Sequence, residues 1–371
     1  MAGVGIQMRI LVVNAGSSSL KLRLIEPDDS VAVSHDLPAL GSEGSAAVLG
    51  KAMRELGRVG AVGHRIVHGG SEFTAPVVID ATVEGQLRSL TDLAPLHQPK
   101  SLAALDATKA ALRDVPAVAC FDTAFHATLS SAASTYALPA AWRSRWNLRR
   151  YGFHGLSHAY VSQRAADVLG QPLESLRLIT CHLGAGASLC AVAGGRSVDT
   201  TMGFTPLDGL VMATRSGSVD PGLLLWLEEH AEVSPSELAS TLENESGLLG
   251  LGGDSRMPVL EERSDQGDPS AQLAISVYLH RLRAAIASMA AAMGGVDALV
   301  FAGGVGENSP RIRAACCEGL EFLGIGVNLS LNDTADEDRQ IGQSGQGTAV
   351  LVVKSREDLQ IARETRHLLE S

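Results

Sequence analysis

The fold is decided by a stretch near the start of the chain, Arg9-Ile-Leu-Val-Val-Asn14-Ala-Gly16-Ser17-Ser18-Ser19-Leu-Lys21-Leu. The apolar run at 10–13 predicts a buried strand, and the alternation from Leu20 predicts a second one. The turn between them presents backbone N–H groups and hydroxyls, and Lys21 adds a positive charge. No Gly-Lys-Ser/Thr follows, so the stretch is not a P-loop. It is either a phosphate-binding hairpin turn or an ordinary turn of the same composition.

The remaining sequence predicts an α/β protein of two domains. The chain has 371 residues, of which 45% are hydrophobic and only 4% aromatic, so its cores are built from Ala, Val and Leu. Strand-like and helix-like segments alternate along it. We expect strands near 63–70, 116–121, 178–182, 188–192 and 296–302, helices over 100–113, from Asp220-Pro221 and over 271–293, and loops around 250–253 and over 328–347.

Charge and cysteine content exclude several classes of protein. With 30 basic and 41 acidic residues the formal charge is −11, and no long basic stripe occurs, so we expect no nucleic-acid or membrane partner. The five cysteines lack the paired spacing of a zinc site or a disulfide framework. No signal sequence or membrane-length apolar run is present, so we expect a cytoplasmic protein.

The opening pattern recurs near the middle of the chain. The segment His182-Leu-Gly184-Ala-Gly186-Ala-Ser188 is again a glycine-rich turn between two predicted strands. This recurrence predicts a duplicated domain, although two such turns can also arise independently. If the domain is duplicated, two phosphate-facing turns border one cleft, which suits a nucleotide held between domains that close.

Blocks dense in polar side chains follow several predicted strands, where open α/β sheets place their sites. They are His64-Arg65-Ile-Val-His68-Gly-Gly, Phe121-Asp122-Thr-Ala-Phe125-His126, Tyr151-Gly-Phe153-His154-Gly155-Leu-Ser-His158 and 205–221. The histidine pairs have a metal-like spacing of four but lack the Glu of a His-Glu-x-x-His zinc site. Taken alone, the arginines of these blocks are as readily surface ion pairs, and Asp208 and Asp220 are turn or cap residues.

Together these motifs resemble the acetate kinase family. The resemblance runs in order from residue 9 to about 367 and is carried by Asn14-Ala-Gly-Ser-Ser-Ser-Leu-Lys21, Gly63-His-Arg65-Ile-Val-His-Gly-Gly, Ala94-Pro-Leu-His97, the blocks at Asp122 and His154, Met202-Gly-Phe-Thr-Pro-Leu-Asp-Gly-Leu, Thr214-Arg215, Gly304-Val-Gly-Glu-Asn308 and Glu357. It implies a duplicated, two-domain, actin-like ATPase (ribonuclease H-like) fold with the active site in the interdomain cleft. It also implies a cytoplasmic homodimer that transfers a phosphoryl group reversibly between ATP and acetate, giving ADP and acetyl phosphate.

The resemblance assigns the residues as follows. The acetate side is a domain of residues 1–122 plus 356–371, and the nucleotide and dimerisation side is 123–355. Phosphoryl transfer to an ionised carboxylate needs positioning and charge neutralisation rather than a general base. The catalytic residues are Asp122, His154, Arg215, Arg65 and His97. Val67 and Leu96, beside Arg65 and His97, are candidates for the apolar wall of the acetate pocket.

The metal, Mg²⁺ with Mn²⁺ as the alternative, is assigned to Asn14 and Glu357, with Asp122 orienting it. The nucleotide is assigned to Lys21, His182, Leu183, Gly184, Ala185, Gly186, Asp254, Ser255, Arg256, Gly304, Val305, Gly306, Glu307 and Asn308.

Three positions depart from the family pattern. Ala185 replaces the usual Asn, Ser255 replaces a frequent Phe beside the adenosine, and Arg356 replaces the Asn that commonly precedes the metal-linked glutamate. None removes a group needed for the transfer itself. Two alternatives remain: a propionate kinase, because one methylene changes discrimination by only ~1–3 kcal/mol, and a nucleotide-switch or assembly protein of the same fold.

Overall fold

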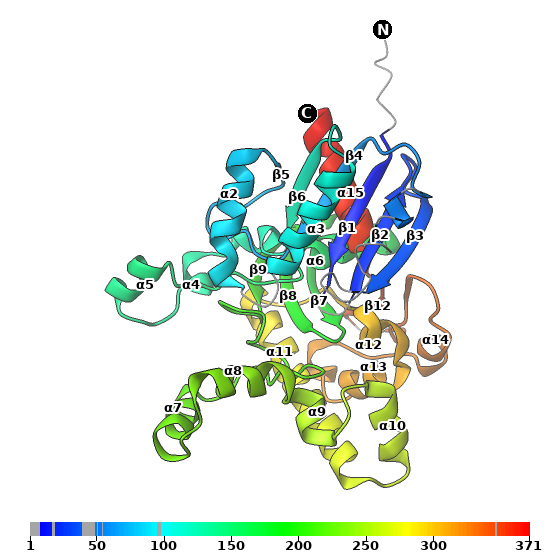
Figure 1. Cartoon of the computed structure of the whole chain (residues 1–371). Helices are drawn as coiled ribbons and strands as arrows, with labels where there is room; N and C mark the ends of the chain where they lie inside the picture. The colour runs from blue at the N-terminus through cyan, green and yellow to red at the C-terminus, as the bar shows by residue number, and fades with distance from the viewer. Residues whose placement is uncertain are drawn as a thin grey trace. The chain divides into compact units, whose positions relative to one another are not determined.

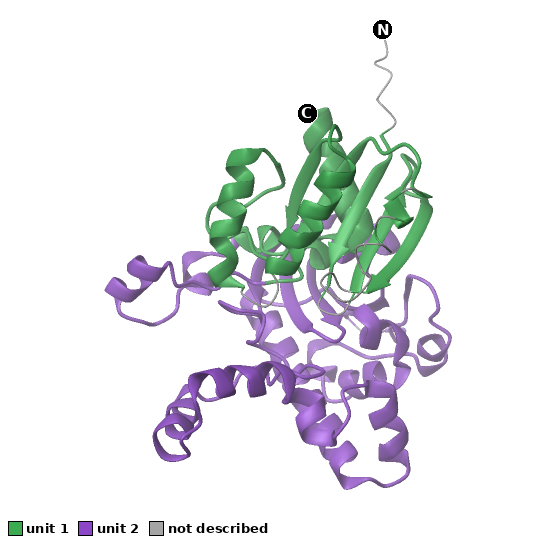
Figure 2. Cartoon of the chain, in the orientation of Figure 1, with its two compact units in different colours: residues 1–127, 153–160, 356–371 green, residues 128–152, 161–355 purple. Residues whose placement is uncertain are grey.

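Two compact units make up the chain (Figure 2). The computed structural model describes residues 8–16, 19–38, 49, 51–53, 55–94, 98–345 and 347–371. Unit 1 comprises residues 1–127, 153–160 and 356–371, and unit 2 comprises 128–152 and 161–355. Unit 1 thus includes 123–127 and 153–160 in addition to the segments assigned from the sequence.

Unit 1 is built on a six-stranded mixed sheet in the order β3-β2-β1-β4-β6-β5. The apolar run at 10–13 is buried on both faces because β1 lies inside the sheet, paired antiparallel with β2 and parallel with β4. The C-terminal helix α15 packs on β4 so closely that a Cβ at Gly63 would lie 2.5 Å from the Thr365 hydroxyl. The elements are β1 (Ile10–Ala15), β2 (Ser19–Ile25), β3 (Val31–Pro38), β4 (Ala61–Ile66), β5 (Val77–Val78), β6 (Ala117–Phe121), α2 (Ala81–Ser89), α3 (Gln98–Ala111) and α15 (Glu357–Glu370), with 3₁₀ turns η1 (Leu90–Leu93) and η2 (Ala124–Thr128).

Unit 2 contains a second six-stranded sheet in the order β11-β12-β10-β7-β8-β9. Its strands are β7 (Arg177–Leu183), β8 (Ala187–Ala193), β9 (Arg196–Thr200), β10 (Ala298–Ala302), β11 (Arg339–Gln340) and β12 (Ala349–Val352). The long helix α11 (Pro269–Met293) packs against β8 (Figure 1). The other helices are α4 (Ser131–Ser134), α5 (Ala140–Trp146), α7 (Pro221–His230), α8 (Pro235–Asn244), α9 (Gly247–Gly252), α10 (Met257–Asp265), α12 (Gly303–Asn308), α13 (Pro310–Cys317) and α14 (Leu329–Asp333), with η3 (Leu173–Ser175) and η4 (Glu321–Leu323); α6 (Gly155–Leu169) runs from unit 1 into unit 2.

The two sheets have one topology. Read from its other edge, the second sheet is β9-β8-β7-β10-β12-β11, which matches β3-β2-β1-β4-β6-β5 strand for strand. The antiparallel and parallel pairings also match, and each sheet has an irregularity between its second and third strands. The duplicated α/β fold predicted from the two glycine-rich turns is confirmed.

Two loop predictions are wrong. Residues 250–253 were expected in a loop, but Gly250 and Gly252 lie in helix α9, which Gly253 ends in a left-handed conformation at φ 74°. Residues 328–347 were expected to be a surface loop, but they contain α14, capped by the Asn328 side chain, and strand β11. The expected helix starting at Asp220 is confirmed, because its carboxylate caps α7.

Two further observations concern compartment and membrane. All five cysteines are buried and form no disulfide, as expected for free thiols that behave as small hydrophobes. Within the described ranges, every helix is too short or too polar to cross a bilayer.

Candidate active site

Four polar side chains converge at one edge of the unit 1 sheet. Asn14 lies near the end of β1, Arg65 near the end of β4, Asp122 directly after β6, and Glu357 at the start of α15. The strands β1, β4 and β6 are neighbours and parallel, so their carboxyl ends meet at the same edge. The sequence blocks that carry Arg65 and Asp122 are therefore brought together by the topology.

Arg65 is the centre of this cluster. Its guanidinium donates to both carboxylate oxygens of Asp122, Nε to Oδ1 at 3.0 Å and Nη2 to Oδ2 at 2.5 Å. Nη1 donates to the Asn14 side-chain oxygen at 3.2 Å, and Nε lies 3.9 Å from a Glu357 oxygen. The amide of Asn14 in turn donates to Glu357 at 2.9 Å. The four side chains thus form one hydrogen-bonded network that combines a fork-shaped cation with two carboxylates.

Burial and charge shift the ionisation of this network. Burial raises the pKa of Asp122 above its ordinary value, although Arg65 opposes that rise. Burial alone would lower the pKa of Arg65, but the adjacent Asp122 and Glu357 outweigh it and raise that pKa. Arg65 therefore stays cationic, and its side chain keeps 14% of its surface exposed, whereas Asp122 keeps 1%.

The chain folds back on Asp122 at the start of α6. The N–H of Gly155 donates to the Asp122 carbonyl at 2.8 Å, and a Cβ at Gly155 would lie 2.2 Å from that oxygen, so only glycine fits. The preceding His154 has φ 57°, a left-handed conformation that is rare for a side chain of this size. Buried His126 holds the Phe153 carbonyl through Nε2 at 3.0 Å. Hydrogen bonds therefore hold the backbone on both sides of His154, and the one at Gly155 holds it against Asp122.

Other histidines of the polar blocks have structural contacts. His64 is buried with its Nε2 3.2 Å from the Thr108 hydroxyl. His68 accepts at Nδ1 from the N–H of Gly70 at 2.8 Å, which closes the glycine turn after β4. Val67, which directly precedes His68 in the sequence, is also buried. His97 and Leu96, predicted on the acetate side, lie outside the described residues, as do Ser17 and Ser18 of the first turn.

Unit 2 contains a comparable edge. The turn after β7 is closed by the Gly184 N–H donating to the Gly186 carbonyl at 3.0 Å, and His182 pairs with Ala302 where β10 ends. The short helix α12 begins there, and a Cβ built on Gly184 would lie 3.9 Å from the Gly304 nitrogen. Two glycine-rich segments therefore lie together at the ends of neighbouring parallel strands.

The α12 segment is held by two side chains. Glu307 accepts at Oε1 from the Gly303 N–H at 2.8 Å and the Ser355 N–H at 2.9 Å, so this carboxylate links the backbone at the start of α12 to the backbone at Ser355. Fully buried Arg313 donates to the carbonyls of Gly306 at 2.9 Å and Glu307 at 2.8 Å. Inside the helix, the Asn308 amide donates to the Gly304 carbonyl. Arg313 was not predicted, since its only sequence signal is an arginine among the apolar residues of α13.

Arg215 also belongs to unit 2, where Glu243 pairs with it at 2.9 Å. Both side chains are largely buried, with 15% and 14% of their surfaces exposed. Arg215 further donates to the Pro206 carbonyl at 3.3 Å. Glu243 was missed by sequence reasoning, because it lies in the unremarked helix α8 and no motif links it to Thr214-Arg215.

The remaining predicted positions have local contacts. Lys21 lies opposite Asn14 in the β1–β2 pair and is exposed. Asp254 and Arg256 form a two-point ion pair, with Arg256 Nη2 2.7 Å from Asp254 Oδ2, on either side of half-buried Ser255.

The other two departures also have defined settings. The Ala185 carbonyl accepts from the Ala213 N–H, so this position acts through its backbone. Arg356 pairs with Asp358 at 2.9 Å, which leaves Glu357 bonded to Asn14.

The donors available for a metal ion are few. No group of three or more His, Cys, Asp or Glu with metal-site geometry occurs in the described part of the chain. The Arg65 network offers two carboxylates and the Asn14 amide oxygen, all hard oxygen donors. Such a set fits Mg²⁺, which keeps several waters and takes one or two protein carboxylates.

Comparison with known proteins identifies the family. The sequence profile of the Acetokinase family matches residues 45–363. The chain belongs to this family. An acetate kinase of Symbiobacterium thermophilum is 44% identical over 397 residues, covering 98% of this chain and 100% of that protein. The crystal structure of Porphyromonas gingivalis acetate kinase superposes with a TM-score of 0.91 at 35% identity, covering 98% of this chain and 100% of that one. A propionate kinase from Francisella tularensis gives a TM-score of 0.90 at 35% identity, covering 96% and 98%.

Family membership confirms two predictions. The resemblance recognised from the motifs is correct, and the chain is an enzyme of the carboxyl-group phosphotransferase class.

Proposed function

We propose that this chain transfers a phosphoryl group reversibly and in line between ATP and acetate, giving ADP and acetyl phosphate. The observation that carries the proposal is the network of Arg65 with Asp122, Asn14 and Glu357 in a member of the Acetokinase family. Acetate is already ionised at neutral pH and needs no general base. What it needs is a cation that offsets its repulsion from the terminal phosphate, and a fixed orientation.

On the acetate side, Arg65 binds the carboxylate of acetate through the fork that Asp122 otherwise occupies. Val67 and Leu96 line the pocket for the methyl group, and His97 supports the bound acetate. Asp122 orients substrate and cation as a carboxylate. His154, fixed beside Asp122 by the Gly155 contact, stabilises charge on the transferring group together with Arg215.

On the nucleotide side, the backbone N–H groups of 182–186 and 304–308 bind phosphates and the adenosine end, with Lys21 adding a positive charge. Asp254, Ser255 and Arg256 lie beside the adenosine. Because Glu307 and Arg313 fasten α12, the glycine backbone there is preorganised for close approach.

Asn14 and Glu357 hold Mg²⁺, directly or through water, with Asp122 beside them. When bound, the ion supplies positive charge against the triphosphate. The residues of the chain do the rest: Arg65 orients the Asp122 carboxylate until acetate takes its place on the fork, and Asn14 orients Glu357 through its amide.

The proposal also includes a homodimer in the cytoplasm. The burial of all five thiols without a disulfide is compatible with a reducing compartment.

Propionate is the main alternative substrate, since the solved propionate kinase is as similar to this chain in fold as the acetate kinase is. The kcat/KM values for acetate, propionate and butyrate decide between them. A higher value for propionate would change the substrate and leave the chemistry intact.

The reaction itself is tested by trapping acyl phosphate with hydroxylamine. ATP, Mg²⁺ and acetate should give acetyl hydroxamate, and omission of acetate should abolish it. Slow ATP hydrolysis without acetate-dependent hydroxamate would favour the nucleotide-switch alternative.

A further inference from the structure

Few ion pairs of the described residues are buried on both sides. Arg65 is 14% exposed, and its partners Asp122 and Glu357 are 1% and 16% exposed. Arg215 and its partner Glu243 are 15% and 14% exposed. In every other described ion pair, at least one side chain is 27% exposed or more. Burying two charges is costly, and the chain does so only at the two arginines proposed as catalytic.

Glu243 lies where a carboxylate does not stabilise its own helix. Helix α8 spans Pro235–Asn244, so Glu243 is in its last turn. The carbonyl groups at a helix C-terminus carry a partial negative charge, which disfavours an acidic side chain there. Glu237, in the first turn of the same helix, has the favourable placement. The charge of Glu243 therefore brings α8 no stability, and the contact that accounts for it is the one with Arg215.

Glu243 also holds the residue that precedes Arg215. Its backbone carbonyl accepts from the Thr214 hydroxyl at 2.8 Å, while its carboxylate oxygen Oε2 lies 2.9 Å from Arg215 Nε. One residue of α8 thus contacts two successive residues of the loop that carries Arg215. A guanidinium group is planar and rigid, so a contact at Nε sets the direction in which its Nη end extends.

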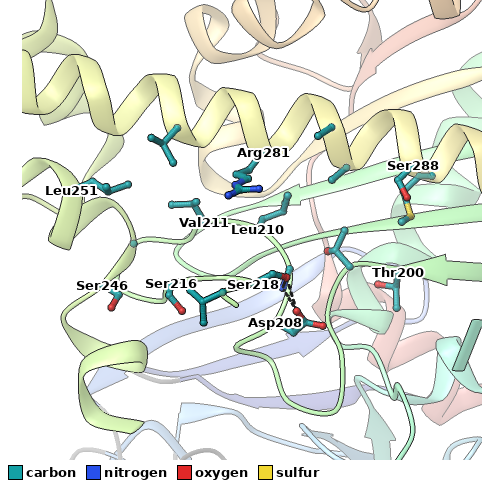
Figure 3. Close-up of a pocket in the computed structure, with 18 of the residues that line it drawn as sticks. Thr200, Asp208, Leu210, Val211, Ser216, Ser218, Ser246, Leu251, Arg281 and Ser288 are labelled. Carbon is teal, nitrogen blue, oxygen red and sulfur yellow. Dashed lines mark hydrogen bonds between the residues drawn. The ribbon is translucent and has the colours of Figure 1, made fainter. Parts of the chain in front are cut away.

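The backbone of this loop has anchors of its own. The Ser216 N–H donates to the Leu242 carbonyl at 3.0 Å, and the Ser246 N–H donates to the Thr214 carbonyl at 2.9 Å. Ser216 and Ser246 both line an open groove beside α11 (Figure 3). Because these bonds do not involve the carboxylate of Glu243, its replacement should release the guanidinium while the loop stays in place.

The same loop contacts the glycine-rich turn after β7. The Ala213 N–H donates to the Ala185 carbonyl at 3.1 Å, and Ala185 belongs to the segment 182–186 that the proposed function assigns to phosphates. Gly247 packs against the loop so closely that a Cβ there would lie 2.6 Å from the Arg215 carbonyl oxygen. The loop is therefore held at a fixed place beside the proposed phosphate-binding backbone, and the direction of the guanidinium remains to be set.

We propose that Glu243 is a positioning residue for Arg215: its carboxylate holds Nε of the guanidinium so that the Nη end meets the phosphoryl group during transfer. The inference rests on the proposed function, which assigns the stabilisation of charge on that group to Arg215. Glu243 itself touches neither substrate in this scheme. A guanidinium already held in its working orientation needs no reordering when charge develops, and this preorganisation is what Glu243 contributes.

The first test removes the carboxylate. Glu243→Ala should lower kcat about 10- to 100-fold in the hydroxamate assay, because a displaced guanidinium no longer meets the transferring group. The KM values for acetate and ATP should change little, since the lost interaction belongs to the transition state. Glu243→Gln, whose amide oxygen can still accept from Nε, should recover most of the lost kcat. A Glu243→Ala variant with wild-type kcat, or a Glu243→Gln variant as slow as Glu243→Ala, would overturn the proposal.

The matched control is Glu245→Ala. Glu245 is the C-terminal cap of α8, and its side chain is exposed. The described contacts of Arg215 do not involve it, so the substitution removes the same charge from the same helix end and leaves the pair intact. This control should keep the wild-type kcat. A loss as large as that of Glu243→Ala would show that the charge at the helix end, and not the pair, matters for turnover, which contradicts the proposal.

A double-variant cycle separates positioning from a general structural role. In an Arg215→Ala background, Glu243→Ala should lower kcat no further, because no guanidinium is left to position. A further loss of about 10-fold or more in that background would show that Glu243 acts independently of Arg215 and would refute the assignment.

Circular dichroism of each variant verifies folding. If Glu243→Ala is unfolded, Glu243→Gln and Glu243→Asp decide, because Asp keeps the charge but withdraws it from Nε by one methylene. The Gln variant should then be the faster one, and the reverse order would contradict the proposal. An inactive wild type would overturn the proposed reaction and this inference with it, whereas an active wild type with an unaffected Glu243→Ala variant would overturn the inference alone.

Discussion

The glycine at the start of α6 gives the sharpest test of the active-site geometry. In a Gly155→Ala variant the added Cβ would lie 2.2 Å from the Asp122 carbonyl oxygen and 2.9 Å from the Cβ of Phe125. Ordinary contacts begin at 3.4 Å, so α6 must move by about 1 Å. That movement breaks the 2.8 Å hydrogen bond from the Gly155 N–H to Asp122, which lowers stability by about 1–3 kcal/mol because the groups are buried.

The effect on catalysis should exceed the effect on folding. Residue 154 precedes the displaced position, and a misplacement of about 1 Å lowers kcat about 100-fold. The assay is hydroxamate formation at saturating ATP and acetate, with thermal unfolding measured in parallel.

Gly85→Ala in α2 is the matched control, since nothing lies within 4 Å of its added Cβ. It should keep the wild-type kcat and gain up to about 1 kcal/mol of stability. A folded Gly155→Ala variant with wild-type kcat would show that this contact does not position His154.

Three further outcomes are expected. Arg65→Lys replaces the two-point contact with Asp122 by a single ammonium, so kcat/KM for acetate should fall about 10- to 100-fold. The KM for ATP should change much less. Equal changes in the KM values for acetate and ATP would contradict the assigned role. His126→Leu removes the donor to the Phe153 carbonyl and should lower both stability and kcat, and His126→Gln, which can still donate, should recover part of each loss; two variants with identical kcat would argue against a positioning role. Burial lowers the pKa of His64 to about 3, whereas an unfolded histidine titrates near 6.5. Between these pH values only the unfolded state binds the extra proton, so the free energy of unfolding should fall by about 1.4 kcal/mol per pH unit as the pH drops below about 6.5. Urea unfolding of His64→Gln should show a weaker pH dependence of this free energy. An unchanged pH dependence would contradict the lowered pKa of His64.

The sequence was sufficient for the parts of the fold that rest on local patterns. The apolar run before Asn14 and the alternation after Ser19 predicted β1 and β2, because a buried strand and a half-buried strand have different periods. The recurrence at His182 predicted the duplication. Neither required knowledge of distant contacts.

Elements that depend on distant contacts were missed. Helix α9 contains three glycines besides its leucines, so its intrinsic helix propensity is low. It forms because the N–H groups of Leu248 and Leu249 bond the carbonyls of Met212 and Ala213. Tertiary hydrogen bonds replace local propensity there, and no local pattern reports them.

The candidate site shows the same division. The residue types of the unit 1 network were predicted individually, since Arg65, Asp122 and Glu357 follow recognisable motifs. Their partners elsewhere were not: Glu243 reaches Arg215 from helix α8, and Arg313 donates to the backbone of the preceding helix α12. Ion pairs between separate elements are set by packing, which a single sequence does not record.

The shared topology of the two sheets also shows where this architecture tolerates enlargement. Unit 1 joins its third and fourth strands by the segment between Pro38 and Ala61, whereas unit 2 places helices α7 to α11 between Thr200 and Ala298. All of that additional chain enters at one connection, so the strand order is the same in both halves. A designer who wished to append a new module could therefore use the Pro38–Ala61 connection, which already has an elaborated counterpart in the same molecule.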